Sequence, residues 1–224
     1  MKAAPKFRKV PQPRGLRVLI VEDHPILRRG LKEILHDEYP EAVFGEAGDS
    51  RTAIRFFEQQ EWDVVLLDIS IPGRDGLELL QDARRIRPDM RVLVVSVYPE
   101  EEFAVRSFKL GAAGYLGKDQ APKILVEAVK KILAGGKYVS PSLAERLATA
   151  LGSHMDRSPT ETLSTRELQV LRMIAAGKTV KAIASELVLS EKTIATYRAR
   201  IAEKTGLSTN VELARYAFRH RLAR

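Results

Sequence analysis

Three short runs of nearly continuous apolar residues set narrow limits on the fold of this chain. They are Leu16–Val21, Trp62–Leu67 and Val92–Val95, and β-branched residues are frequent in them. A strand with apolar side chains on both faces belongs in a parallel sheet that helices cover on both sides. Ala42–Glu46 and Gly114–Leu116 are two weaker strand candidates of the same region.

The segments that separate these strands repeat their apolar residues with the period of an amphipathic helix. The predicted helices are Ile26–Leu35, Arg51–Gln59, Gly76–Arg87, Glu101–Leu110 and Lys123–Leu133. Successive strand–helix units predict a doubly wound α/β domain with a five-stranded parallel sheet over residues 16–135. Ligands of such domains bind beyond the carboxyl ends of the strands, so the residues at those ends are the candidates for a binding site.

Polar residues follow these strands. Glu22 and Asp23 come after the first strand, Asp68 ends the third, Ser96 ends the fourth and Lys118 follows the fifth. Three carboxylates at one sheet edge repel each other unless a hard cation lies among them, and an oxygen-only ligand set favours Mg²⁺. A lysine and a hydroxyl beside them can bind phosphoryl oxygens. Asp68 is then the expected nucleophile, which would take a phosphoryl group as an acyl phosphate.

Other features of this region exclude or limit alternative sites. No glycine-rich dinucleotide fingerprint follows Val21, and the chain has no P-loop motif, so nucleotide-binding folds of these kinds are not expected. His24 stands beside the acidic pair, but we do not expect it as a metal ligand because the first helix begins there. Tyr98 is expected to be an exposed loop aromatic.

Four stretches carry a family resemblance: VLIVEDHPILRRGL, DVVLLDISIPGRDGLELL, VLVVSVYPEEE and GAAGYLGKD. They resemble the receiver domain of bacterial two-component response regulators over about residues 16–135. The resemblance implies that Asp68 is the phosphoacceptor and that a sensor histidine kinase is the donor. It also implies that Mg²⁺ is held by Glu22, Asp23, Asp68 and the backbone carbonyl of Ser70, and that Ser96 and Lys118 contact the phosphoryl group. Tyr115 is then the aromatic that shifts with Ser96, unless it only packs at the sheet edge. Pro72-Gly73 would make a tight turn.

Charge is distributed unevenly along the chain, which carries +8 in total. Residues 1–15 hold five basic and no acidic groups, residues 16–140 carry −3, and residues 161–224 carry +6. We expect a disordered basic tail over 1–15, the receiver over 16–135, a linker with a short helix over 136–162, and a second, basic domain over 163–224. A basic domain behind an acidic one is typical of a protein with a polyanionic partner.

The basic segment contains the signals of four short helices. They are predicted at Thr165–Ala176, Val180–Glu186, Glu191–Thr205 and Val211–Arg219. Ser164 with Glu167 and Thr209 with Glu212 fit the capping box, and Gly177 and Gly206 are placed as helix stops. Only four residues join the second helix to the third, which is short enough for a helix-turn-helix corner.

The third of these helices has two unlike faces. Ile194, Tyr197, Ile201 and Thr205 share the face expected to pack inward, while small residues alternate with long donors on the other face. The whole segment resembles the LuxR-type helix-turn-helix of NarL/FixJ-type response regulators. The DNA-contact candidates are Lys192, Thr196 and Arg200 on the recognition helix, and Lys178 and Lys204 for phosphates.

These observations predict a DNA-binding transcriptional response regulator that is phosphorylated on Asp68 and binds double-stranded operator DNA as a homodimer. The alternative is a phosphorylation-independent DNA-binding regulator whose receiver only mediates association. We do not expect an enzyme beyond slow autodephosphorylation, since dehalogenase-like phosphohydrolases generally carry a second Asp where this chain has Ser70. Without cysteine, a signal peptide or a membrane span, we expect a cytoplasmic protein with no membrane partner.

Overall fold

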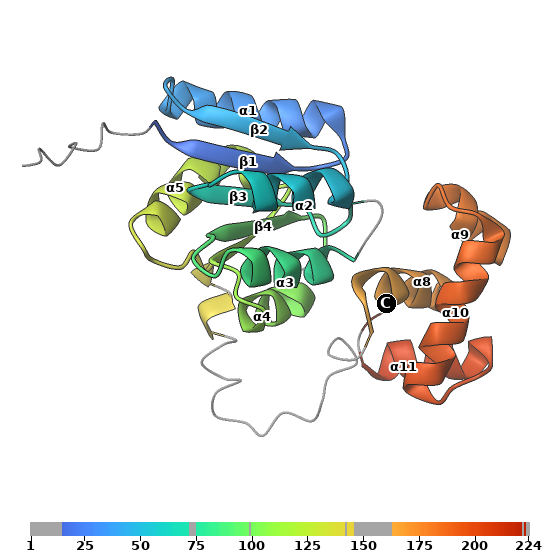
Figure 1. The fold of residues 1–224 in the computed structure, drawn as a ribbon. Helices are drawn as coiled ribbons and strands as arrows, with labels where there is room; N and C mark the ends of the chain where they lie inside the picture. Colours follow the sequence, from blue (N-terminus) through green and yellow to red (C-terminus); the bar gives the residue numbers. More distant parts are fainter. Residues whose placement is uncertain are drawn as a thin grey trace, which may run out of the picture.

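The computed structural model describes residues 15–71, 75–98, 100–141, 143–145, 163–220 and 222. The expected basic tail, the Pro72-Gly73 turn and most of the expected linker lie outside these residues. The described chain forms an α/β part, from β1 to α5, and a helical part, from α8 to α11 (Figure 1).

The α/β part is built on one parallel sheet with the strand order β2-β1-β3-β4-β5. Its strands are β1 (Arg17–Val21), β2 (Val43–Ala47), β3 (Val64–Leu67), β4 (Val92–Ser96) and β5 (Gly114–Gly117). Its helices are α1 (Pro25–Glu38), α2 (Ser50–Gln59), α3 (Gly76–Ile86), α4 (Glu100–Lys109) and α5 (Ala121–Leu133). All five predicted strands and all five predicted helices are confirmed, with ends that shift by a few residues.

Alternation along the strands divides the core into two layers. Val18 and Ile20 of β1 pack in the layer that contains α1 and α5, whereas Leu19 and Val21 pack in the layer of α2, α3 and α4 (Figure 1). Successive side chains of a strand point to opposite faces, so a strand covered on both sides needs apolar residues throughout. Every residue of β3 is accordingly buried.

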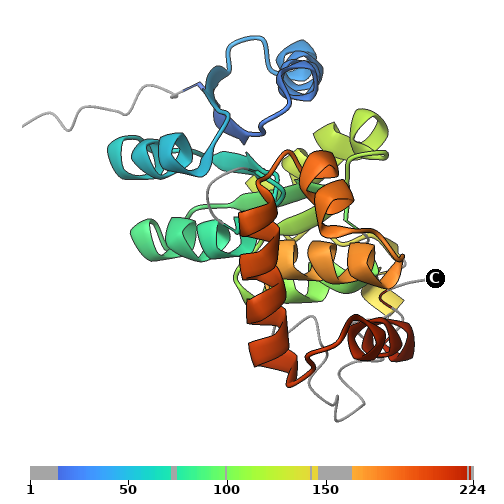
Figure 2. The ribbon, with the colours of Figure 1, turned by 90° about the vertical axis from the view of Figure 1, so that its right-hand side faces the viewer.

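The helical part contains α8 (Thr165–Ala175), α9 (Val180–Glu186), α10 (Glu191–Thr205) and α11 (Asn210–Arg219). Both predicted capping boxes are present, and the hydroxyl of Ser190 accepts a hydrogen bond from the Thr193 amide at the start of α10. Gly177 and Gly206 have φ angles of 76° and 72°, the left-handed region in which glycine ends a helix without strain. Figure 2 shows α10 as the long helix that crosses this part.

Helix α8 joins the two parts. Leu163, Leu168 and Val170 belong to the same apolar cluster as the α2, α3 and α4 side of the sheet. In Figure 1 the strands run toward the side of the molecule on which α8 lies. The helical part therefore rests on the α/β part near the carboxyl ends of the strands, where the polar residues follow.

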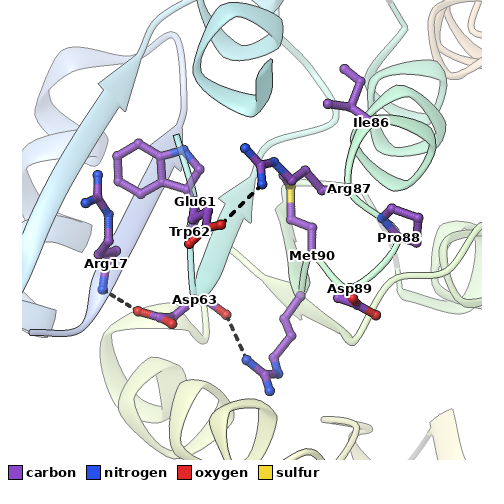
Figure 3. Close-up of a pocket in the computed structure, with 10 residues that line it drawn as sticks. Arg17, Glu61, Trp62, Asp63, Ile86, Arg87, Pro88, Asp89 and Met90 are labelled. Atoms are coloured by element: carbon purple, nitrogen blue, oxygen red, sulfur yellow. Dashed lines mark hydrogen bonds and ion pairs between the residues drawn. The ribbon is translucent and has the colours of Figure 1, made fainter. Parts of the chain in front are cut away.

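A hollow lies at the opposite, amino-terminal end of the sheet (Figure 3). Three arginines line it, and each has a partner: the backbone N–H of Arg17 donates to Asp63 Oδ2 over 2.7 Å, Arg87 pairs with Glu61, and Arg91 donates to the carbonyl of Asp63. These contacts tie β1, β3 and β4 together at their starts, so we assign this end of the sheet a structural role.

Gly76, the first residue of α3, permits a close approach to the chain that follows β3. A Cβ atom at Gly76 would lie 2.2 Å from the Cα and 2.5 Å from the carbonyl oxygen of Ile69.

We expect Gly76→Ala to lower the free energy of unfolding by about 2–3 kcal/mol, because backbone atoms must move. Urea unfolding followed by the fluorescence of Trp62, the single tryptophan, measures this loss. Gly30→Ala in α1, which meets no atom within 4 Å, is the control and should stabilise the chain by about 1 kcal/mol; equal midpoints for the two variants would contradict the packing argument.

Candidate functional site

Three carboxylates and one imidazole gather at the carboxyl ends of β1 and β3. The ligand atoms of Glu22, Asp23, His24 and Asp68 all lie within 4.8 Å of one another. Glu22 and Asp68 are 1% exposed, while Asp23 opens to solvent. The carboxylate oxygens form the ligand set that Mg²⁺ prefers, so these side chains fit the predicted cation.

Lys118 supplies positive charge to this cluster from the end of β5. Its Nζ lies 2.8 Å from Asp68 Oδ2 and 2.7 Å from Glu22 Oε2. Burial by itself would lower the pKa of Lys118, but the charge of Asp68 and the hydrogen bonds to Asp68 and Glu22 outweigh it and raise that pKa. Burial, and then the charge of Asp68, raises the pKa of Glu22. One ammonium among three carboxylates leaves the pocket with excess negative charge, which attracts a divalent cation.

His24 lies at the rim of the acidic cluster, at the N-cap of α1. Its Nδ1 is 2.8 Å from Asp23 Oδ1 and 2.9 Å from Glu22 Oε1, and its side chain is 69% exposed. The hydrogen bond to Glu22 and the charge of Asp23 raise the pKa of this imidazole. Sequence reasoning foresaw the start of the helix here but not this contact with both carboxylates.

A hydrogen-bonded chain runs from Ser96 through the loop after β4. The fully buried Ser96 accepts a hydrogen bond at Oγ from the backbone N–H of Tyr98, over 3.1 Å. Tyr115 is also fully buried and donates its hydroxyl to the carbonyl of Tyr98, over 2.9 Å. Burial raises the pKa of both tyrosine hydroxyls. Tyr115 therefore packs in the core and contacts the same loop as Ser96.

The expectation that Tyr98 is an exposed loop aromatic is wrong. Its side chain is 7% exposed, it stacks on Phe103 with ring centroids 4.7 Å apart, and its hydroxyl donates to Gln169 Oε1 over 3.0 Å. Gln169 belongs to α8, so the helical part contacts the loop that follows β4.

Two more contacts fasten the start of α8 to the pocket. The carboxylate of Asp75 accepts hydrogen bonds from the backbone N–H of Leu77 in α3, over 2.9 Å, and from that of Thr165 in α8, over 2.6 Å. The guanidinium of Arg166 donates to the carbonyl oxygen of Ser70 over 2.6 Å, while the Ser70 N–H donates to Asp68 Oδ1 over 2.8 Å. Helix α8 thus touches the loop that leaves the acidic cluster.

The predicted two faces of α10 are present. Ile194 and Ile201 are completely buried and Tyr197 and Thr205 are half-buried, as expected of the inward face. Lys192, Thr196 and Arg200 are exposed, together with the small residues Ala195 and Ala199 between them. An exposed face of long donors and small side chains can approach the edges of bases closely.

The two phosphate-contact candidates outside this face are engaged in ion pairs. Lys178 pairs with Glu186, and Lys204 Nζ lies 2.6 Å from Glu167 Oε2. Glu167 is 2% exposed and also completes the capping box of α8, so Lys204 neutralises a nearly buried charge.

Comparison with known families assigns both parts of the chain. Residues 18–130 match the family described as response regulator receiver domain, and residues 161–217 match bacterial regulatory proteins of the luxR family. The chain is a two-component response regulator of the LuxR family. As a member of this family, it is a DNA-binding regulator.

Relatives of this response regulator match nearly its whole length. The response regulator GacA of Pseudomonas aeruginosa is 38% identical over 206 residues, which span 92% of this chain and 96% of that protein. UvrY of Escherichia coli is 36% identical over 208 residues, 92% of this chain and 95% of that protein. Among solved structures, RcsB of Salmonella typhimurium has a TM-score of 0.56 at 26% identity and covers 92% of this chain and 98% of its own.

Sequence reasoning missed the residues of this response regulator that join its two parts. Asp75, Arg166 and Gln169 make their contacts across 90, 96 and 71 residues of chain. Only Asp75 carries a local signal, as a good N-cap for α3, and that signal does not reveal its second partner. Within the described residues, no helix is long and apolar enough to cross a bilayer.

Lys118 should stabilise the folded receiver in the absence of divalent cations. We expect Lys118→Met to lower the free energy of unfolding by about 3 kcal/mol, because two buried carboxylates lose their counter-charge. Mg²⁺ should recover part of this loss. Urea unfolding with and without Mg²⁺ measures both effects, and the exposed Lys123→Met is the matched control. A Lys118→Met chain as stable as Lys123→Met would contradict the argument.

Proposed function

We propose that this response regulator accepts a phosphoryl group on Asp68 from the phosphohistidine of a sensor histidine kinase. The observation that carries the proposal is the place of Asp68: a nearly buried carboxylate at the end of β3, 2.8 Å from Lys118 Nζ and beside the carboxylates of Glu22 and Asp23. A structural ion pair would need no such excess of acidic groups. Receiver domains in general imply a histidine kinase as partner.

In the proposed step, a carboxylate oxygen of Asp68 attacks the phosphorus atom. An O–P bond forms, the P–N bond to the kinase imidazole breaks, and the departing imidazole takes up a proton. Lys118 Nζ and Ser96 Oγ would hold the phosphoryl oxygens. Tyr115 would follow Ser96, since both side chains bond the backbone of Tyr98. Slow loss of the phosphoryl group to water is the only enzymatic activity that we propose.

Glu22, Asp23, Asp68 and the backbone carbonyl of Ser70 would hold Mg²⁺. This set is all oxygen, it has excess negative charge, and three of its members lie within the 4.8 Å cluster. When bound, the ion would neutralise charge on the phosphoryl oxygens.

Phosphorylation would act on DNA binding by a shift between two populated arrangements of the chain. In the active arrangement, a homodimer would place two copies of α10 in paired half-sites of double-stranded DNA, about one helical turn apart. Solved RcsB structures include a DNA complex and two dimers bound to two parallel DNAs, which supports this arrangement by similarity. Lys192, Thr196 and Arg200 of α10 would contact the DNA, whether at bases or at phosphates, and Lys178 and Lys204 would contact phosphates.

The proposed boundaries follow from these roles: the receiver over residues 16–135, a linker over 136–162 and the DNA-binding domain over 163–224, behind a basic tail. A regulator that meets both a kinase and DNA works in the cytoplasm, which is the location that we propose.

Asp68→Asn should abolish phosphorylation because the amide lacks the nucleophilic oxygen charge. The chain would be incubated with Mg²⁺ and acetyl phosphate, and the phosphorylated fraction read by intact mass and by mobility on a phosphate-affinity gel. Asp37→Asn, an exposed carboxylate of α1, is the control and should be phosphorylated as the unaltered chain is. Undiminished labelling of Asp68→Asn would overturn the acceptor assignment.

Arg200→Ala and Lys192→Ala should weaken the binding of a mixed-sequence DNA duplex. Each lost phosphate contact is expected to reduce the slope of log K against log salt by about 1. Fluorescence anisotropy over a series of salt concentrations gives this slope. Lys131→Ala removes the same charge from an exposed position of α5 and should leave the slope unchanged. If all three variants behave alike, α10 is not the DNA-binding face.

A further inference from the structure

The carbonyl oxygen of Ser70 is a possible ligand for two cations, the guanidinium of Arg166 and Mg²⁺. Arg166 donates from Nη2 to the carbonyl oxygen of Ser70 over 2.6 Å, and the proposed function gives the same oxygen to Mg²⁺. We propose that Arg166 and Mg²⁺ compete for this carbonyl, so that the docking of α8 on the receiver and the binding of the metal ion oppose each other. The proposal rests on the proposed metal site and adds its control by the DNA-binding domain.

Both terminal nitrogens of the Arg166 guanidinium, Nη1 and Nη2, donate hydrogen bonds. Nη1 donates to Gln169 Oε1 over 2.9 Å, and the same oxygen accepts the hydroxyl of Tyr98 over 3.0 Å. A guanidinium keeps its positive charge at any ordinary pH and presents its donors as a rigid fork. Arg166 therefore reaches the Ser70 carbonyl as a pre-oriented group rather than as a mobile surface charge.

Residues of the proposed metal site and residues of α8 line one hollow. Asp23 and Ser70 line it from the receiver, and Arg166 and Gln169 line it from α8, around a volume of about 550 Å³. The positive charge of Arg166 thus faces the solvent-open side of the acidic cluster. When α8 is docked, Arg166 both occupies the carbonyl oxygen of Ser70 and places a positive charge on the side from which Mg²⁺ would enter.

Other contacts hold α8 against the receiver without touching a proposed metal ligand. Arg106 donates to the carbonyl of Leu163, Asp75 accepts from Thr165, and the guanidinium of Arg172 lies 5.9 Å from the ring centroid of Phe103. The docked arrangement is therefore held by several bonds, of which the one from Arg166 is shared with the metal site. By linkage, docking must weaken metal affinity by the same factor by which the metal ion weakens docking.

The first test measures metal affinity on the full chain, with Mn²⁺ as the probe and the free ion counted by its electron paramagnetic resonance signal. Arg166→Gln should bind Mn²⁺ about tenfold more tightly than the unaltered chain, the effect of losing one competing charge-assisted hydrogen bond. Gln169→Ala keeps the charge of Arg166 but removes the oxygen that orients it, so its affinity should also rise. Arg215→Gln in α11, an exposed arginine, is the matched control for charge and should change nothing.

Two outcomes of this titration overturn the proposal. Equal affinity of the unaltered chain and Arg166→Gln removes the competition altogether. Tighter binding by Arg166→Gln with no change in Gln169→Ala assigns the effect to charge repulsion and not to the shared carbonyl. Asp23→Asn separates these results from a failure of the proposed function, because a chain that keeps its Mn²⁺ affinity without this carboxylate has its metal site elsewhere.

The second test measures docking. The chain has no cysteine, so Glu58→Cys on α2 and Glu203→Cys on α10 allow two nitroxide labels at exposed positions. Addition of Mg²⁺ should move the label-to-label distance distribution toward the one that Arg166→Gln gives without Mg²⁺. A distribution that Mg²⁺ leaves unchanged, at a concentration that saturates the site, would overturn the linkage between metal binding and docking.

Discussion

Repulsion between carboxylates that are held together out of water is the constraint around which this response regulator is arranged. Glu22 and Asp68 lie almost completely buried beside Asp23, and burial of charge is costly unless a counter-charge is close. Lys118 supplies one positive charge from the end of the edge strand β5, and its Nζ pairs with both buried carboxylates. The remaining negative charge gives the pocket its capacity for a cation and for the oxygens of a phosphoryl group.

The sheet topology is what brings these groups together. In the order β2-β1-β3-β4-β5, strand β1 lies between β2 and β3, so the carboxyl ends of β1 and β3 are neighbours. Val21 pairs with Leu67, which places the residues that follow them side by side. Lys118 comes from the edge strand β5 and needs its long side chain to cross the end of β4. The acidic site is thus a consequence of strand order as much as of residue type.

Local signals predicted most of the fold, because strands, caps and stops depend on residues near in sequence. The capping boxes at Ser164 and Thr209 are examples, as is the acidic pair after β1. Tyr98 shows where such signals end: its hydroxyl bonds Gln169 of α8, a contact across 71 residues that no pattern within the receiver could indicate. Lys178 and Lys204 show the same limit, since a basic residue does not reveal by itself that a glutamate of the same domain neutralises it. Contacts between the two parts depend on how their surfaces fit together. The periodicity of apolar residues within either part carries no information about that fit.

Asp75 binds the N-terminal ends of two helices, one from each part of the chain. One carboxylate serves the N-termini of α3 and α8 together, where the partial positive charges of two helix dipoles meet it. If α8 leaves, α3 keeps its cap, and α8 keeps the capping box of Ser164 and Glu167. Separation of the two parts would therefore leave the N-terminus of each helix capped, so it would not require either helix to unfold at that end.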